Sequence, residues 1–289
     1  MSFHNVHHSD HRETKPLQAG PQVPLRDLFR LDGRTIIISG ASGLLGQTTT
    51  ATCLESGADV VALDMVESPP EAEWAKLQHL AEQHSRHLSY HQLDVTDDAA
   101  IPAVFEKIVS SLHHPIRGFV SCAGMAVTAS AVEMPVATFR KLFHINTIGT
   151  FAIAQAVAKE MCRTGETGSM VFVASMSGYR ANKGVDTAAY NSSKAAVHQL
   201  ARSLAAEWGS RKGMPLIRVN SLSPGYIRTA ATAEALEVPG MENQWVSDNM
   251  LNRLSTVDEF RAPMLFLLSD GSSFMTGADL RVDGGHCAW

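Results

Sequence analysis

Cysteine is scarce in this sequence, which has four in 289 residues and no C-x-x-C pair. Widely spaced cysteines exclude a disulfide framework and the common thiolate metal motifs, and they favour a reducing compartment. We therefore expect a cytoplasmic protein that binds no metal and buries its cysteines as small side chains: Cys53, Cys122, Cys162 and Cys287.

An excess of basic residues and long apolar runs are also missing. The 24 Lys and Arg stand against 29 Asp and Glu, a formal net charge of −5, whereas nucleic-acid binders usually carry a basic stripe. No apolar run approaches the roughly 20 residues that cross a bilayer, and residues 1–28 lack the apolar segment of a signal peptide. These features predict a globular enzyme or binding domain with neither nucleic acid nor membrane as a partner.

Residues 1–24 are polar and are interrupted by Pro16, Pro21 and Pro24. This composition predicts a flexible N-terminal tail, followed by a single domain over residues 25–289, which contain no second linker or repeat. The tail includes a histidine tract that we interpret as solvated, because no cysteine or carboxylate cage accompanies it: His4, His7, His8 and His11.

Beyond residue 34, short apolar runs alternate with segments of helical pattern. Strands are predicted at 35–39, 59–63, 88–93, 118–122, 169–174 and 216–222, with helices at 47–56, 71–84, 99–112 and 195–208. This alternation is typical of βαβ units, whose parallel sheet is covered on both faces. We predict an α/β fold with one doubly wound, Rossmann-type sheet and ligand sites at the carboxyl ends of its strands.

A glycine-rich turn separates the first predicted strand from the first helix. Gly40 allows the tight turn, Gly43 lets the backbone approach a pyrophosphate, and Gly46 lets the helix pack on the sheet. The helix N-terminus then offers unpaired N–H groups to an anion. The turn, including Ser42 and Leu45, therefore predicts a dinucleotide site, although glycines also occur in such turns for packing alone.

Asp64 ends the second predicted strand, about 20 residues after the glycine turn. A carboxylate at this place can accept hydrogen bonds from the adenosine ribose, and it would repel a 2′-phosphate. No Arg or Lys lies within the turn or just after Asp64. The sequence thus predicts NAD rather than NADP as the cofactor.

Tyr190 and Lys194 are four residues apart in a segment of good helix formers, so both side chains lie on one helix face. A nearby ammonium favours the phenolate, which predicts a lowered pKa for Tyr190. A tyrosine tuned in this way can exchange a proton with an alcohol or carbonyl oxygen. The same spacing arises often by chance, so the pair alone does not define a site.

Taken in order, these motifs resemble the short-chain dehydrogenase/reductase family, and their downstream part is similar to its compact branch. The resemblance covers residues 28–285 and is carried by the glycine turn at Gly40, Asp94-Val95, Cys122-Ala123-Gly124, Asn146 to Gly149, Ser175, Tyr190 with Lys194, Pro224 to Thr229, and Val282 to Gly285. It implies an oxidoreductase that interconverts a secondary alcohol and a ketone by hydride transfer with NAD(H). It also implies a homotetramer or homodimer.

The resemblance implies a role for each matching catalytic residue. Tyr190 would be the general acid/base, and Lys194 would lower its pKa and hold the nicotinamide ribose. Ser175 would hydrogen-bond the substrate oxygen, and Asn146 would support a proton-relay water at Lys194. Ser177 is a rival to Ser175, which is favoured because two residues and a glycine follow it, as in the family.

The remaining family positions imply contacts with the cofactor. Asp94 and Val95 would flank the adenine, and residues 224–229 would line the nicotinamide pocket. The full set of implied cofactor-binding residues is Gly40, Ser42, Gly43, Leu45, Asp64, Asp94, Val95, Cys122, Ala123, Gly124, Tyr190, Lys194, Pro224, Gly225, Ile227 and Thr229.

Two departures from the family pattern concern the cofactor site. Leu44 stands where compact members usually have a glycine, and Ser121 and Cys122 replace two asparagines. These changes motivate an alternative, a non-redox isomerase, cyclase or nucleotide-sensing protein that keeps the cofactor site. Retention of all four catalytic residues argues against it.

Residues 174–178 and 224–229 and the Cys-Ala-Trp ending look most like fungal polyol and sorbose reductases. Residues 230–250 lie where the family places its substrate lid, and their composition favours a ring or apolar alcohol over a bare polyol. An ordinary surface helix pair is the alternative for this segment. His144 and His198 are interpreted as structural histidines rather than additional bases.

Overall fold

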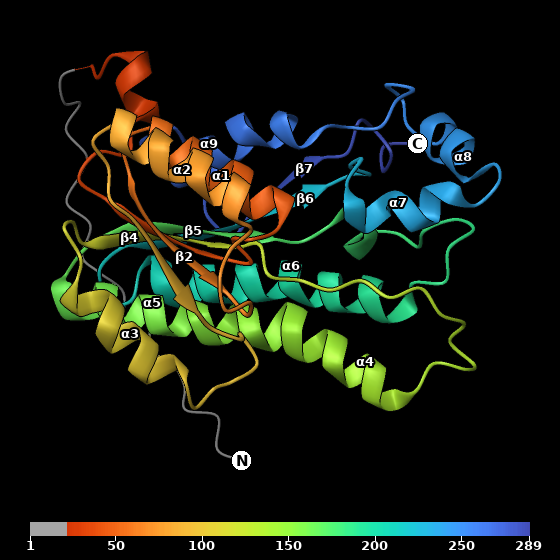
Figure 1. Ribbon diagram of the computed structural model, residues 1–289, viewed down its shortest axis with the longest axis horizontal. Helices are drawn as coiled ribbons and strands as arrows, with labels where there is room; N and C mark the ends of the chain where they lie inside the picture. The colour runs from red at the N-terminus through yellow and green to blue at the C-terminus, as the bar shows by residue number, and fades with distance from the viewer. Residues whose placement is uncertain (1–21) are drawn as a thin grey trace.

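The computed structural model describes residues 22–289, except the side chains of Ala230, Ala231 and Glu234. The predicted tail up to residue 21, with its histidine tract, lies outside the described residues. The strands are β1 (Thr35–Ser39), β2 (Asp59–Asp64), β3 (Leu88–Gln92), β4 (Ile116–Ser121), β5 (Gly168–Val173), β6 (Ile217–Pro224) and β7 (Asp279–Val282). They form one parallel sheet in the order β3-β2-β1-β4-β5-β6-β7, which confirms the predicted doubly wound fold (Figure 1).

Helices cover both faces of this sheet (Figure 1). On one face lie α1 (Leu44–Glu55), α2 (Glu71–Gln83) and α9 (Arg261–Leu268); on the other lie α3 (Ile101–Ser110), α4 (Val136–Phe143), α5 (Thr150–Thr164) and α6 (Ala188–Gly209). A π-helical segment, η3 (His144–Gly149), joins α4 to α5, and α7 (Ala230–Glu237) and α8 (Met241–Ser247) follow β6. Short 3-10 turns are η2 (Leu25–Phe29), η4 (Met176–Gly178), η5 (Val257–Phe260) and η6 (Asp270–Ser272).

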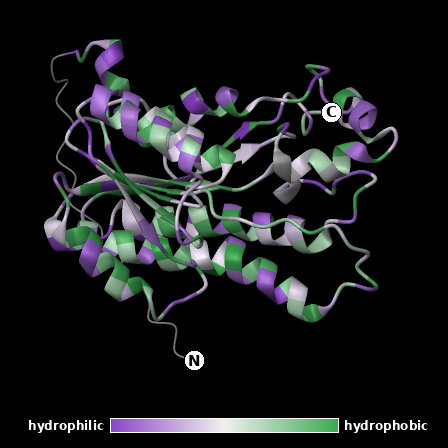
Figure 2. Cartoon of the chain, in the orientation of Figure 1, coloured by the Kyte–Doolittle hydropathy of each residue, from purple (hydrophilic) through white to green (hydrophobic). Residues whose placement is uncertain are grey.

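The sheet separates two hydrophobic cores. In β1, Ile37 packs into the core that contains Phe119 and Phe172, whereas Ile36 and Ile38 pack into the core on the opposite face. Successive side chains of a strand point to opposite faces, so a strand buried on both sides is apolar throughout. This explains the continuous hydrophobic strands near the centre of the molecule (Figure 2).

The sequence predicts six of the seven strands and misses β7 (Asp279–Val282). This strand has only four residues, and Asp279 and Arg281 interrupt its apolar pattern. It nevertheless pairs in parallel with β6, with Ser221 opposite Asp279. Among residues 22–289, no helix has the length and apolar character needed to cross a membrane.

Candidate active site

A cavity of about 680 Å³ opens at the carboxyl ends of β1 to β4. Eight of the predicted cofactor-binding residues line it: Gly40, Gly43, Asp64, Asp94, Val95, Cys122, Ala123 and Gly124. These residues belong to four segments that are far apart in sequence, and parallel strand order brings their ends to one edge of the sheet. The cavity therefore lies where a doubly wound sheet usually binds its ligand.

The three glycines of the first turn differ in how tightly they are packed. Gly40 has a φ of +68°, and a Cβ placed there would lie 2.4 Å from the Ala123 nitrogen. At Gly46 a Cβ would lie 2.2 Å from the Gly40 carbonyl oxygen. At Gly43 the nearest atom is the same oxygen at 3.4 Å, an ordinary contact. Gly40 and Gly46 thus serve packing, whereas Gly43 leaves room at the cavity for a ligand to approach.

Alanine substitutions should separate these two roles. Gly46→Ala is expected to lower the free energy of unfolding by about 1–3 kcal/mol, because its Cβ would overlap a backbone carbonyl that cannot move freely. Gly43→Ala should change that free energy by less than about 0.5 kcal/mol and act on ligand binding instead. Urea unfolding of both variants measures the difference, and equal destabilisation would contradict this division of roles.

Asp64 faces the glycine turn from the end of β2. Its Oδ2 accepts a hydrogen bond from the backbone N–H of Ser42 at 2.9 Å. The next residue, Met65, is 63% exposed and lines the cavity. The cations that line the cavity, Arg140 and Lys141, come from α4 and not from the segment after Asp64. Among the charged residues that line the cavity, Asp64 is therefore the one bonded to the glycine turn.

The π-helical segment η3 carries Asn146 into the interior. Its Oδ1 accepts the Met125 N–H at 2.8 Å, and its Nδ2 donates to the Met125 carbonyl at 2.9 Å and to Ser193 Oγ at 2.9 Å. Ser193 Oγ in turn donates to the carbonyl oxygen of Tyr190 at 2.7 Å. Asn146 thereby ties the loop after β4 to the helix α6.

Gly124 shows that Asn146 lies near Lys194. A Cβ at Gly124 would lie 3.5 Å from both Asn146 Oδ1 and Lys194 Nζ. Sequence reasoning missed Met125 and Ser193 as the partners of Asn146. The sequence offers a hint only for Ser193, which lies between Tyr190 and Lys194. Met125 could not be predicted, because it bonds through backbone groups that every residue type has.

Tyr190 and Lys194 lie together on α6, as predicted from their spacing. Lys194 Nζ lies 5.8 Å from the centre of the Tyr190 ring and donates a hydrogen bond to the Val173 carbonyl at 2.8 Å. Burial lowers the pKa of Lys194 to about 8. Burial also raises the pKa of Tyr190, while its hydrogen bond with Ser175 acts in the opposite direction. The predicted lowering of the Tyr190 pKa is therefore wrong, because removing the phenol from water outweighs the other influences.

Ser175, and not Ser177, is the serine that contacts Tyr190. Ser175 is buried at the end of β5, bonds to Tyr190, and accepts the Ser177 N–H at 3.1 Å, so it caps the turn η4. The Ser177 hydroxyl donates instead to Asn182 Oδ1 at 2.9 Å. Ser175 is thus the serine beside Tyr190, and its role toward the substrate stays a prediction.

The two departures from the family pattern have clear structural environments. Ser121 Oγ accepts the Val173 N–H at 3.3 Å, so it still links β4 to β5. Cys122 is bonded through its backbone N–H to the Ser39 carbonyl at 2.9 Å, and burial raises the pKa of its thiol to about 12. Leu44 begins α1 with its side chain 46% exposed. With these residues in place, Ser121 still pairs with Ser39 at the ends of β4 and β1.

The segment after β6 lies next to the end of β5 along the same edge of the sheet. A Cβ at Gly225 would lie 2.7 Å from Asp283 Cα, which explains a glycine after Pro224. Ile227 forms a parallel bridge with Ser255, and Thr229 caps α7 together with Thr232. These contacts fix residues 224–229 at the carboxyl end of β6.

The predicted lid region folds as the helix pair α7 and α8. Trp245 of α8 is buried and stacks on Tyr226, with ring centres 3.9 Å apart. Gln244 Nε2 donates to the Lys183 carbonyl at 2.6 Å, which joins α8 to the loop between η4 and α6. The helix α8 therefore packs against residues 224–229 and against the loop that follows η4.

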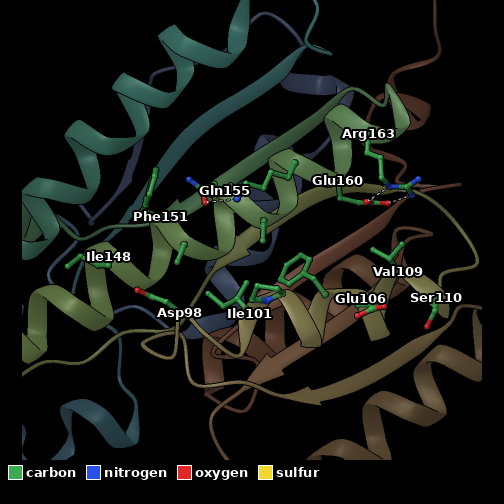
Figure 3. Close-up of a pocket in the computed structure, with 15 residues that line it drawn as sticks. Asp98, Ile101, Glu106, Val109, Ser110, Ile148, Phe151, Gln155, Glu160 and Arg163 are labelled. Carbon is green, nitrogen blue, oxygen red and sulfur yellow. Dashed lines mark hydrogen bonds and ion pairs between the residues drawn. The ribbon is translucent and has the colours of Figure 1, made fainter. Parts of the chain in front are cut away.

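A larger cavity, of about 860 Å³, lies between α3 and α5 (Figure 3). Figure 3 shows Ile148 and Phe151 towards one end of it and the ion pair of Glu160 with Arg163 towards the other. Phe105 also lines it, but none of the predicted site residues does. Because no predicted cofactor-binding residue lines it, in contrast to the 680 Å³ cavity, it is not the candidate active site.

Comparisons with known proteins agree with this geometry. The family model described as enoyl-(acyl carrier protein) reductase matches residues 40–286. The short chain dehydrogenases/reductase notP′ of Aspergillus versicolor is 63% identical over 285 residues, covering 99% of this chain and 98% of that protein. The D-arabinitol 2-dehydrogenase (ribulose-forming) of Candida tropicalis is 35% identical over 272 residues, 90% of this chain and 95% of that protein.

A solved structure is similar over nearly the whole chain. The NADPH-dependent 3-quinuclidinone reductase of Rhodotorula rubra superposes with a TM-score of 0.84 at 29% identity, covering 96% of this chain and 100% of that one. The similarity therefore extends through the sheet, the candidate site and the helices that cover them.

Proposed function

Because the chain belongs to the short-chain dehydrogenase/reductase family of oxidoreductases, we propose that it interconverts a secondary alcohol and a ketone with NAD(H). Tyr190 is the general acid/base of this proposal. The observation that carries it is the grouping of Tyr190 with the buried Ser175 and Lys194 where α6 meets the end of β5, close to the 680 Å³ cavity.

The proposed chemistry divides between the protein and the cofactor. A nicotinamide, when bound, would supply or accept the hydride. The hydroxyl groups of Ser175 and Tyr190 would hold the substrate oxygen, and Tyr190 would give a proton to the ketone or take one from the alcohol. Lys194, whose pKa burial lowers to about 8, can release or take up a proton near neutral pH and thereby restore Tyr190. Asn146 holds the loop after β4 against α6 during these steps.

The residues of the cavity fit a dinucleotide. The open side of Gly43 and the N-terminus of α1 suit a pyrophosphate, because Gly43 leaves room for it and the first N–H groups of α1 have no partner within the helix. Asp64 suits ribose hydroxyl groups and disfavours a 2′-phosphate, which supports NAD over NADP. One structural relative is NADPH-dependent, so this choice rests on the local charge at Asp64. The proposed cofactor contacts are those named from the sequence.

Substrate class is proposed from the relatives and the lid together. D-arabinitol is the substrate named for one relative, and 3-quinuclidinone, a cyclic ketone, for another. The stacked Tyr226 and Trp245 beside the site support a substrate with an apolar or cyclic part. We therefore propose that the substrate is a secondary alcohol or a ketone. Polyols and cyclic ketones are the two classes of compound to be tested.

Nicotinamide absorbance tests the proposed function. Purified protein is incubated with NAD and a panel of polyols and cyclic alcohols, or with NADH and the matching ketones. The expected result is a substrate-dependent absorbance change. Tight NADH binding with no change for any panel member, or product formation without net cofactor consumption, would favour the non-redox alternative.

We also propose that a second copy of the chain covers the exposed side of η3 and α5. Ile148 and Phe151 are large apolar side chains, 47% and 38% exposed, and they border the 860 Å³ cavity (Figure 3). Val136 and Phe139 of the adjoining α4 are exposed as well. Exposed apolar side chains on one helical layer support self-association as a homodimer or homotetramer.

Sedimentation velocity tests the self-association. Phe151→Glu is expected to convert the wild-type oligomer into a smaller species, because it places a charge in the buried interface. Leu25→Glu, at a residue 73% exposed on η2, is the matched control and should sediment like the wild type. A monomeric wild type, or an unchanged Phe151→Glu oligomer, would contradict the proposed interface.

A cytoplasmic location is also proposed. All four cysteines are free, which supports a reducing compartment. The expectation that all four are buried is wrong, because only Cys53 is fully buried and Cys162 is exposed.

A further inference from the structure

His198 lies on the same face of α6 as the catalytic pair. It follows Lys194 by four residues and Tyr190 by eight, and it is 3% exposed. The structure agrees with its interpretation as a structural histidine, since its ring is enclosed on several sides. Its partners, however, belong to the very segments that carry the proposed active site.

One edge of the His198 ring faces the end of β6. His198 Nε2 lies 2.7 Å from Ser223 Oγ, and Ser223 Oγ donates to Asp279 Oδ1 at 2.8 Å. A hydroxyl group has one hydrogen, so Ser223 accepts from His198, and Nε2 must carry the ring proton. Burial lowers the pKa of His198, which favours the neutral ring. Asp279 Oδ1 also accepts from Ser221 Oγ at 2.5 Å, so the carboxylate fixes both serines of β6.

The other parts of the His198 ring face the turn that carries Ser175. A Cβ at Gly178 would lie 2.7 Å from His198 Cε1 and 2.9 Å from its Nδ1, so the turn η4 rests directly on the ring. Tyr179, the next residue, packs against His198 with ring centres 4.4 Å apart and ring planes tilted by 36°. Gly178 is bonded through its N–H to the Ser175 carbonyl at 3.0 Å. The position of His198 therefore sets the position of the Ser175 backbone.

From these contacts we infer that His198 is a positioning residue for the proposed reaction. It fixes the spacing between the Ser175–Tyr190 hydroxyl pair and residues 224–229, which begin immediately after Ser223. Hydride transfer requires the substrate carbon and the nicotinamide in a defined geometry, and a displacement of about 1 Å can cost about a hundredfold in rate. This inference rests on the proposed function, because the two groups it holds apart are those proposed for substrate and cofactor.

Three variants separate positioning from general stability. His198→Leu fills the site but removes the donor to Ser223, whereas His198→Gln can place an N–H near the Nε2 position. Leu204→Ala, at a buried residue further along α6, removes core packing without touching this network. All three are compared with the wild type in melting temperature before any other measurement.

Hydrogen exchange gives a readout that does not require turnover. In His198→Leu, amides of residues 175–179 and 225–229 are expected to exchange about tenfold faster or more, and His198→Gln should largely restore their protection. Leu204→Ala should lower the melting temperature without a preferential change in these two segments. Equal exchange of both segments in His198→Leu and the wild type would overturn the inference.

Kinetics with an accepted substrate complete the test. His198→Leu is expected to lower kcat about tenfold or more with a smaller change in the KM for NADH, and to raise the primary deuterium isotope effect with deuterated NADH. His198→Gln should recover most of kcat. Loss of kcat in proportion to melting temperature across all three variants would overturn the inference. A wild type without turnover would count against the proposed function alone, because the exchange experiment decides the role of His198 independently.

Discussion

Replacing Tyr190 with phenylalanine is expected to lower kcat by about 10²–10⁴-fold, the usual contribution of a positioned general acid or base. The phenol is the proposed proton donor to the ketone, and it contacts the buried Ser175 hydroxyl. Phenylalanine keeps the ring and removes only the oxygen. NADH binding, followed by fluorescence, should change little because Lys194 and the glycine turn remain.

Serine variants provide the matched controls for this experiment. Ser175→Ala should lower kcat by about 10-fold to 10³-fold, since it removes a hydroxyl that would bind the substrate oxygen as charge develops. Ser177→Ala should stay within about threefold of the wild type, because its hydroxyl is bonded to Asn182 and not to the catalytic pair. If Tyr190→Phe retains wild-type kcat, the proton must come from another group and the proposed mechanism fails.

Much of the site follows from sequence because it is built from strand ends. Gly40, Asp64, Asp94 and Cys122 all end strands or follow them, and a parallel sheet brings such positions to one edge. The spacing of Tyr190 and Lys194 similarly determines that they share a helix face. These inferences need only the positions of the strand ends and the helical repeat, and both can be recognised from the pattern of residue types.

What the sequence does not reveal depends on burial and on backbone partners. The pKa of Tyr190 is raised rather than lowered because desolvation acts on the phenolate, and the degree of burial depends on the whole fold. The bonds of Asn146 to Met125 use backbone groups that every residue has. The network of His198, Ser223 and Asp279 could not be predicted either. Its carboxylate lies on β7, a strand too short and too polar to be recognised from the sequence.

Asp64→Asn is expected to lower the ratio of the Kd for NADP to the Kd for NAD by about tenfold to a hundredfold. A like-charge contact costs several kcal/mol, and each 1.4 kcal/mol is a factor of ten in affinity. Asparagine keeps an oxygen that can accept the Ser42 N–H, so the turn should stay in place. Adding Met65→Arg, at the exposed cavity residue that follows, should lower the ratio further by pairing with the 2′-phosphate.

Asp94→Asn is the matched control for this charge argument. Asp94 lines the same cavity. Its Oδ1 accepts hydrogen bonds from the backbone N–H of Thr96 at 2.9 Å and from the Thr96 hydroxyl at 2.8 Å. If net charge in the cavity selected the cofactor, Asp94→Asn would shift the ratio as much as Asp64→Asn. If the contact with the ribose selects it, only Asp64→Asn will shift the ratio. A wild type that binds NADP as tightly as NAD would instead show that Arg140 and Lys141, the cations of the facing helix, outweigh Asp64 and would contradict the proposed preference.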